Sequence, residues 1–359
     1  MTRSLLLATL RDPASVRQLT MPQWDLLLRQ AASAKLMACL VCLFDDAGLT
    51  VGLPQPVRAH VEWTRVQMTR HAGAVHFEIL RIQAALAGLG VPVVLLKGAA
   101  YSAAGLAPAR GRLFGDIDVM VPKARLADAE AALMLHGWVS QSHDDYDQRY
   151  YRQWMHEIPP MQHTRRQSVI DVHHAILPET ARVRPDPSKL RAAAVPIPGL
   201  PGMYMLAPAD MVLHSAVHLF YDGEFDSGLR DLVDLHRLLT QFGATPGFWE
   251  QLPVRGVEME LARPLLYALR YSQQLLGTAV PAAVFAALAP AAPNRLLMRL
   301  MDAMLARGLQ PAHASCDDAW SSIARAGLYI RGNWLRMPPL LLAKHLFHKA
   351  FITKKATPA

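Results

Sequence analysis

Apolar residues recur at the three- and four-residue spacing of helices over roughly the first 90 positions of the chain. This spacing predicts a short helix over residues 1–10, one helix from Pro22 to Ala47 and a long helix from Pro56 to Leu89. A similar spacing returns from Tyr204 onward. We therefore expect two helical regions, one on either side of a middle segment whose pattern differs.

The middle segment alternates short apolar runs with helical stretches, which predicts strands and helices in turn. Val91–Leu96 is continuous and β-branched, so it predicts a buried strand, which ends at Lys97-Gly98 and leads into a helix. Residues 116–121 predict a second strand, and Pro122 to Gly137 predicts the helix that crosses over after it.

A third strand is predicted over Val169–Ile176, with residues 154–162 as its hairpin partner and a basic turn between them. Pro159 and Pro160 favour an edge strand or a broken strand for that partner, because proline donates no ladder hydrogen bond. Five prolines between Pro185 and Pro201 predict an irregular linker.

The second strand contains two carboxylates, Asp116 and Asp118, in an otherwise apolar run. Side chains alternate faces along a strand, so these two project together. Two like charges on a half-buried strand are costly unless a cation compensates them, and a divalent cation prefers oxygen ligands. An isolated Asp-x-Asp at a strand end is usually just solvated, so the surrounding residues decide the interpretation.

Upstream of this pair, a strand, a glycine and a helix start form a corner suited to phosphate. Gly98 and Ala99 offer backbone N–H groups at the helix start, and glycine permits close approach of a ligand. Lys97 adds a positive charge, and Arg112 lies four residues before Asp116. The order strand, Lys-Gly, helix, Arg, strand with Asp-x-Asp is far more specific than any one of its parts.

The segments Leu95–Gly98 and Arg112–Val121 resemble the nucleotidyltransferase (DNA polymerase β-like) superfamily. More narrowly, they resemble the bacterial "uncharacterised nucleotidyltransferase" family, whose members have Leu-Lys-Gly, then Arg, then Gly-Asp-x-Asp. The wider superfamily has Gly-Ser or Gly-Gly after the first strand. Lys97-Gly98-Ala99 departs from this pattern, which removes a serine contact to phosphate and shifts weight onto Lys97 and the amides of Gly98 and Ala99.

The resemblance implies an α+β fold, with a nucleotidyltransferase-type mixed β-sheet core flanked by N- and C-terminal helical regions. We expect the helical region over residues 1–90, the core over 91–200 and a C-terminal helical domain over 201–359. It also implies a third catalytic carboxylate on a neighbouring strand, for which Asp171 is the candidate. Alternatively, Asp171 caps a turn and His173 is a structural histidine.

By the same resemblance, the enzyme moves a nucleoside monophosphate from an NTP to an acceptor, with Mg²⁺ or Mn²⁺ as the cofactor. Asp116, Asp118 and Asp171 are the expected catalytic residues and metal ligands, because two divalent ions can stabilise the attacking and leaving oxygens of an in-line displacement. The expected nucleotide-binding residues are Lys97, Gly98, Ala99 and Arg112; Arg112 has an ion pair with the aspartates as its alternative role.

Five further residues are candidates for lining the cleft: His173, His214, His218, Arg230 and Asp234. His214 and His218 share one helix face, but no third ligand in the manner of H-E-x-x-H accompanies them, so core or pocket histidines are favoured over zinc. Arg230 and Asp234, with Asp231 between them, either face the cleft or lie on a solvated helix face.

Composition restricts the class of partner. Apolar residues make up 52% of the chain and charged residues 18%, which excludes a disordered protein, and the net charge of +8 favours anionic ligands. The basic residues are dispersed, so nucleic acid is not favoured. The acceptor is expected to be a small molecule, a peptide or a protein.

Localisation follows from cysteines and hydropathy. Cys39, Cys42 and Cys316 form no disulfide framework or zinc quartet, which fits a reducing cytoplasm. No apolar stretch reaches the ~20 residues of a membrane span. The basic, apolar segment 334–351 could contact a membrane surface, although packing as the last helix is favoured.

Two other functions remain open at this stage. The fold could transfer another phosphate-linked group, such as a sugar in natural-product or polysaccharide tailoring. It could also be a catalytically degenerate nucleotide-binding regulator, although the complete carboxylate set argues against that function.

Overall fold

The computed structural model describes residues 4–141, 148, 151–152 and 154–338. Among these residues, seven strands form one mixed sheet in the order β3-β4-β5-β2-β1-β7-β6. The strands are β1 (Val93–Leu95), β2 (Asp116–Met120), β3 (Trp138–Ser140), β4 (Met161–His163), β5 (Val169–His173), β6 (Val195–Pro196) and β7 (Met203–Met205).

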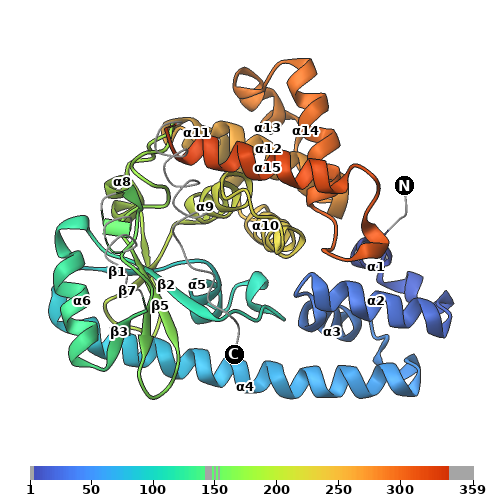
Figure 1. The fold of residues 1–359 in the computed structure, drawn as a ribbon, viewed down its shortest axis with the longest axis horizontal. Coiled ribbons are helices and arrows are strands. Elements are labelled where there is room, and N and C mark those ends of the chain that lie inside the picture. Colours follow the sequence, from blue (N-terminus) through green and yellow to red (C-terminus); the bar gives the residue numbers. More distant parts are fainter. Residues whose placement is uncertain (1–3, 142–147, 149–150, 153, 339–359) are drawn as a thin grey trace, which may run out of the picture.

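Helices surround this sheet (Figure 1). They are α1 (Leu5–Arg11), α2 (Met21–Ser33), α3 (Met37–Asp46), α4 (Gln55–Leu86), α5 (Lys97–Ala103), α6 (Leu126–Leu135), α8 (Pro187–Ala192), α9 (Pro208–Tyr221), α10 (Gly228–Phe242), α11 (Phe248–Glu258), α12 (Ala262–Leu276), α13 (Ala282–Leu288), α14 (Arg295–Gly308) and α15 (Ser321–Arg336). The mixed α+β fold expected from the sequence is confirmed.

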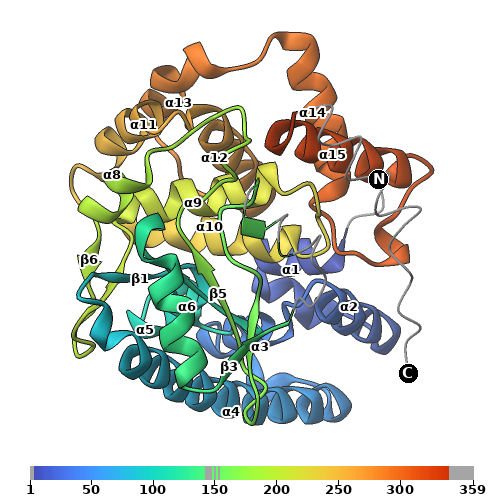
Figure 2. The ribbon, with the colours of Figure 1, turned by 60° about the vertical axis from the view of Figure 1, so that its left-hand side comes forward.

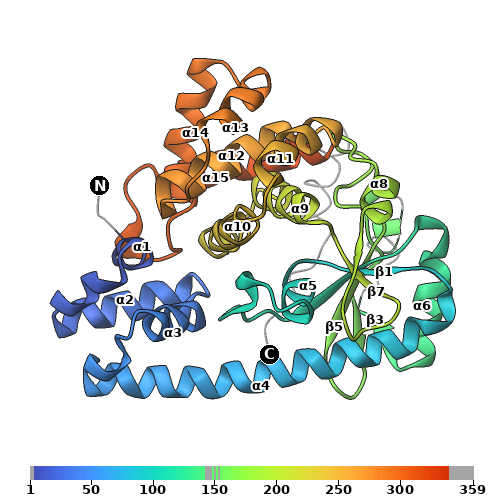
Figure 3. The same ribbon diagram turned by 180° about the vertical axis from the view of Figure 1, so that it is seen from behind.

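The long helix α4 runs along one side of the molecule, from beneath α2 and α3 to the sheet (Figures 1 and 3). It contacts α3, α5 and α6, so it ties the N-terminal helices to the sheet. Helices α9 to α15 form a layer above α5 and the sheet in the view of Figure 1. Figure 2 shows α6 on the outer side of the sheet, opposite this layer.

The centre of the sheet sets the register of the acidic residues. β1 is completely buried and pairs with β2 in the antiparallel direction, with Leu95 opposite Val119. β2 and β5 are parallel, with Asp118 opposite Asp171. The apolar residues Ile117 and Ile170 alternate with these carboxylates and are buried in the core, as period-two patterning requires.

Three sequence predictions about elements are wrong. The single helix expected from Pro22 to Ala47 is two helices, α2 and α3, because the chain turns at Lys35, whose φ is 57°. The linker expected between Pro185 and Pro201 contains α8 and β6. Pro187 lies in the first turn of α8, and the Asp186 carboxylate accepts a hydrogen bond from the Ser188 N–H, so this proline begins a helix instead of preventing one.

The third wrong prediction concerns residues 203–205, where the chain was expected to be helical from Tyr204 onward. They form β7, which pairs with β1 in the parallel direction. Three residues are too few for a hydrophobic period to distinguish a strand from a helix. The division of the chain at residues 90 and 200 stays a prediction.

The hairpin and the long helix agree with their patterns. β4 begins directly after Pro160 and pairs with β5, so the two prolines shorten the strand at its start. The chain from 163 to 167 forms the turn between β4 and β5. Within the described part of the chain, no helix combines the length and the apolar character needed to cross a bilayer.

Candidate functional site

Three carboxylates meet where β2 and β5 begin. Asp116 and Asp118 lie on one face of β2, and Asp171 lies opposite Asp118 on β5. One oxygen atom from each lies within 4.8 Å of the others. Asp116 is exposed, Asp171 is partly buried and Asp118 is buried, so the group extends from solvent into the protein.

Asp118 is compensated by two basic side chains. Its Oδ2 lies 3.5 Å from Lys97 Nζ, and its Oδ1 lies 3.0 Å from His173 Nε2. Burial alone would raise the pKa of Asp118, but the Lys97 charge and the His173 hydrogen bond outweigh burial and hold the pKa well below its ordinary value. Asp118 therefore stays ionised.

His173 lies between two carboxylates. Its Nδ1 is 3.1 Å from Glu157 Oε2, while its Nε2 faces Asp118. Burial lowers the pKa of His173, but Glu157 and Asp118 raise it by more, so the net shift of the pKa is upward. When it is protonated, the ring donates to both carboxylates and fixes the orientation of Asp118.

Asp171 is the uncompensated member of the group. Burial, together with the negative charges of Asp118 and Glu157, raises its pKa to about 7. Its Oδ1 is buried and has no hydrogen-bond partner among the described residues. A buried, unpaired carboxylate oxygen beside two other carboxylates is the arrangement that a bound cation would stabilise.

The corner after β1 is built from Lys97, Gly98 and Ala99, the first residues of α5. Lys97 has a φ of 42°, a left-handed conformation that is unfavourable for a residue with a side chain. The Leu96 N–H donates to the Asp118 carbonyl over 2.9 Å, which joins this corner to β2. The strained backbone of Lys97 places its ammonium group beside the carboxylates.

Gly98 has a packing role at the same corner. A Cβ added there would lie 2.8 Å from Phe114 Cδ1 and 3.0 Å from Arg112 Nε. Gly98 and Ala99 are both buried. Glycine is thus required for the contact with Phe114, whether or not a phosphate approaches.

Arg112 does not pair with the aspartates of β2. Its guanidinium forms ion pairs with Asp234 and, at 3.8 Å, with Asp231, both on α10. The solvated face considered for these two aspartates is wrong, because both lie in buried ion pairs with Arg112. Burial raises the pKa of Asp234 to about 6 despite the Arg112 charge. Arg112 therefore fastens the segment before β2 to α10.

The carboxylates open into a cavity of about 530 Å³, which we call the carboxylate cleft. Among the predicted residues, Lys97, Arg112, Asp116, Asp118, Asp171, His218 and Arg230 line it. His173, His214 and Asp234 do not line it; they lie buried behind its wall. His218 Nδ1 is 3.6 Å from Asp231 Oδ2, so this histidine is held by α10.

The comparisons with known proteins add one finding to this geometry. Residues 20–277 match the model of a family described as "Uncharacterised nucleotidyltransferase". This chain belongs to that nucleotidyltransferase family. The match covers α2 to α4, the whole sheet and the helices up to α12. Searches of curated proteins and of solved structures gave no match.

Membership makes the protein a transferase and confirms the resemblance seen in its sequence. A family of nucleotidyltransferases also implies a nucleotide as a substrate. The two histidines on α9 join no metal-binding group with a third residue among the described residues. Cys39 and Cys42 are free and buried.

Sequence reasoning missed several residues of this nucleotidyltransferase's site. Glu157, with His156 and His173, forms a second group whose ligand atoms lie close enough to hold a metal. Lys35 and Phe114 line the carboxylate cleft. Glu157 could have been identified from the sequence, since it lies in the predicted hairpin partner of the Asp171 strand. Lys35 could not have been identified, because its position depends on the turn between α2 and α3, which the sequence did not predict.

Proposed function

We propose that this nucleotidyltransferase moves a nucleoside monophosphate from an NTP to an acceptor hydroxyl or phosphate, and that the reaction depends on a divalent metal. The observation that carries the proposal is the meeting of Asp116, Asp118 and Asp171 within 4.8 Å on adjacent strands. The acceptor we favour is a small molecule, a peptide or a protein.

The residues present fit a hard divalent cation. All three donors are carboxylate oxygens, which Mg²⁺ and Mn²⁺ prefer over softer metals. The buried Oδ1 of Asp171 has no other partner among the described residues, and the charge of its carboxylate is destabilised by its neighbours. When bound, such a cation would neutralise charge on the phosphates and on the attacking oxygen.

The chemistry requires an acceptor oxygen to attack the α-phosphorus. A new P–O bond forms, the bond from the α-phosphorus to the bridging oxygen breaks, and pyrophosphate leaves with the electron pair. The acceptor proton passes to Asp171, which lies beside Asp116 and Asp118 and acts as the base. Lys97, beside Asp118, supplies positive charge to the phosphates that enter the carboxylate cleft.

Asp118→Asn tests the proposal. Because Asp118 is the buried centre of the carboxylate group, we expect the variant to lose at least about 100-fold in turnover. Turnover is measured as transfer of label from each α-³²P-labelled NTP to components of a cell lysate, with Mg²⁺ or Mn²⁺. Asp128→Asn is the matched control, since Asp128 is an exposed carboxylate whose side chain faces Arg125 on the surface.

Full turnover by Asp118→Asn contradicts the proposed site. Labelling that is unchanged in excess EDTA contradicts metal dependence. If no NTP donates its label but a labelled sugar nucleotide donates its sugar, the second function, transfer of another phosphate-linked group, replaces the first.

A further inference from the structure

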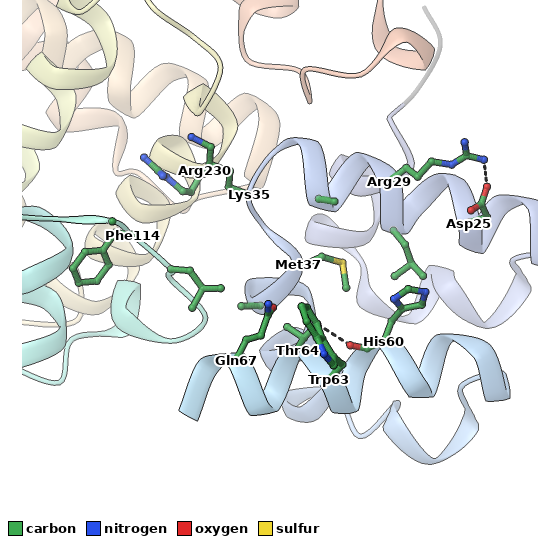
Figure 4. Close-up of a pocket in the computed structure, with 15 residues that line it drawn as sticks. Asp25, Arg29, Lys35, Met37, His60, Trp63, Thr64, Gln67, Phe114 and Arg230 are labelled. Carbon is green, nitrogen blue, oxygen red and sulfur yellow. Dashed lines mark hydrogen bonds and ion pairs between the residues drawn. The ribbon is translucent and has the colours of Figure 1, made fainter. Parts of the chain in front are cut away.

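A larger cavity, of about 770 Å³, lies between α2, α3, α4 and the segment before β2 (Figure 4). We call it the α2–α4 cavity. Trp63 and Gln67 point into it from α4, and Met37 reaches it from α3 (Figure 4). The mechanism proposed above uses none of these three side chains.

The α2–α4 cavity adjoins the carboxylate cleft. Lys35, Phe114, Gly115 and Arg230 line both spaces. Gly115 directly precedes Asp116, so the junction lies next to the carboxylates. Figure 4 shows Lys35 and Arg230 near one another on the side of the cavity toward α10. A ligand that spans the junction therefore passes Lys35 and Arg230, whose guanidinium also pairs with Asp231 over 2.8 Å.

The junction lies on the Lys97 side of the carboxylates. Phe114 packs against Gly98, the residue after Lys97. By contrast, Asp171 lies on β5, on the other side of β2 in the sheet, and shares that side of the cleft with Gln141 and Pro160. The acceptor must reach Asp171, so the Phe114 side is left for the NTP.

The walls of the α2–α4 cavity suit a flat heterocycle. Trp63 is 62% exposed, so much of its ring is accessible to a ligand in the cavity. Met37 supplies apolar surface, while Gln67 and His60 offer groups that can hydrogen-bond to the edge of a base. Stacking on an aromatic ring is the general way in which proteins hold nucleobases.

We propose that the α2–α4 cavity holds the nucleoside part of the NTP, with the base against Trp63 and the phosphates passing Lys35 and Arg230 into the carboxylate cleft. This inference rests on the proposed function and adds to it the place of the donor. It also assigns a role to the N-terminal helices, which form most of this cavity.

The test compares ligands with and without a nucleoside. Each of the four NTPs is compared with inorganic tripolyphosphate. Binding is measured by calorimetry with Mg²⁺ and without acceptor. In Trp63→Ala we expect NTP affinity to fall about tenfold or more, since stacking accounts for a large part of base binding. Tripolyphosphate affinity should stay within about twofold of wild type.

Three further variants sharpen the comparison. Trp63→Phe keeps an aromatic face and should restore most of the NTP affinity. Trp320→Ala is the matched control, because the Trp320 side chain is also 62% exposed but lies outside both cavities. Lys97→Ala should weaken NTP and tripolyphosphate alike. If Trp63→Ala does not fold, the loss of NTP-induced tryptophan quenching in Trp63→Phe gives the same answer.

The outcomes separate the two proposals. If Trp63→Ala binds NTP as well as wild type does, or weakens both ligands equally, the base lies elsewhere, and the α2–α4 cavity becomes the candidate acceptor site. The proposed function survives that result. If the wild-type protein binds neither NTP nor tripolyphosphate with Mg²⁺, both proposals are overturned.

Discussion

Asp118 and Asp171 lie opposite one another on adjacent strands, yet the protein stabilises the charge of one and destabilises the charge of the other. Lys97 and His173 stabilise the charge of Asp118, whereas the charge of Asp171 is opposed by burial and by its acidic neighbours. Removing the Asp118 charge would deprive the buried Lys97 and His173 side chains of one acidic partner. Removing the Asp171 charge would relieve repulsion.

The stability of the metal-free protein should depend on pH through Asp171. Its pKa is about 7 when folded and ~3.9 when unfolded, so between these values the folded state holds the extra proton. Stability from this group is therefore greatest near pH 4, falls as pH rises to about 7 and is constant above. At pH 8 we expect Asp171→Asn to be more stable than wild type, on the order of 2 kcal/mol.

Chemical denaturation in EDTA at several pH values between 5 and 9 measures this difference. Asp128→Asn serves again as the exposed control, and its stability should follow that of wild type. A variant Asp171→Asn that is less stable than wild type at pH 8 would show that the Asp171 charge is compensated by a group other than a metal.

At the scale of single residues, the positions of side chains could be predicted from the sequence where the two-residue period of a strand decides which face they lie on. Asp116 and Asp118 had to share a face, and Asp171 lies on the adjacent strand as the family resemblance implied. The partner of Arg112 could not be predicted. Its ion pair with Asp234 joins positions 122 residues apart, and no local pattern records such a contact.

Helix α10 packs against α9 and α12 and contributes Arg230 to the carboxylate cleft, and Arg112 attaches the segment before β2 to it. The Arg112 side chain is only 7% exposed and faces two carboxylates of α10. Its Nε is also buried and has no partner within the described ranges. A buried pair of this kind is costly to break from one side, because charges remain without compensation.

We therefore expect Arg112→Ala to lower the free energy of unfolding by about 3–5 kcal/mol. Arg110→Ala is the matched control: Arg110 pairs with Asp46, but both side chains are more than half exposed, so the loss should stay below about 1 kcal/mol. Urea denaturation measures both. If Arg112→Ala keeps wild-type stability but loses NTP binding, Arg112 is a phosphate ligand and not an attachment for α10.

Elements were predictable where the hydrophobic period runs for several turns. The 32-residue helix α4 lies where its pattern placed it, and β5 begins at Val169 as predicted but ends at His173, before the predicted Ile176. The break between α2 and α3 was not predicted, because lysine is not a typical turn residue, although Lys35 adopts a left-handed conformation there. That turn brings Lys35 to the junction of the two cavities, so a missed boundary hid a residue of the site.

For the whole molecule, the net charge of +8 raises the question of polyanion binding. We expect weak, sequence-independent binding to tRNA or duplex DNA that is lost near physiological salt, while NTP binding with Mg²⁺ persists. Affinity for duplex DNA falls with salt with a slope of about −0.9 per neutralised phosphate. Electrophoretic mobility shifts at several salt concentrations measure this. A submicromolar complex with one RNA that resists salt would make a nucleic-acid end the acceptor.

The carboxylate cleft draws its walls from distant stretches of the chain, among them the turn at Lys35, the strands β2 and β5, and helix α10. Contacts between positions so far apart close long loops, and such contacts form slowly. A chain emerging from the ribosome can pair β2 with β5 before α10 has been made, but Arg112 then has no carboxylate to face. In that order of folding, the carboxylate cleft is completed only when α10 docks, after Asp116, Asp118 and Asp171 have been brought together.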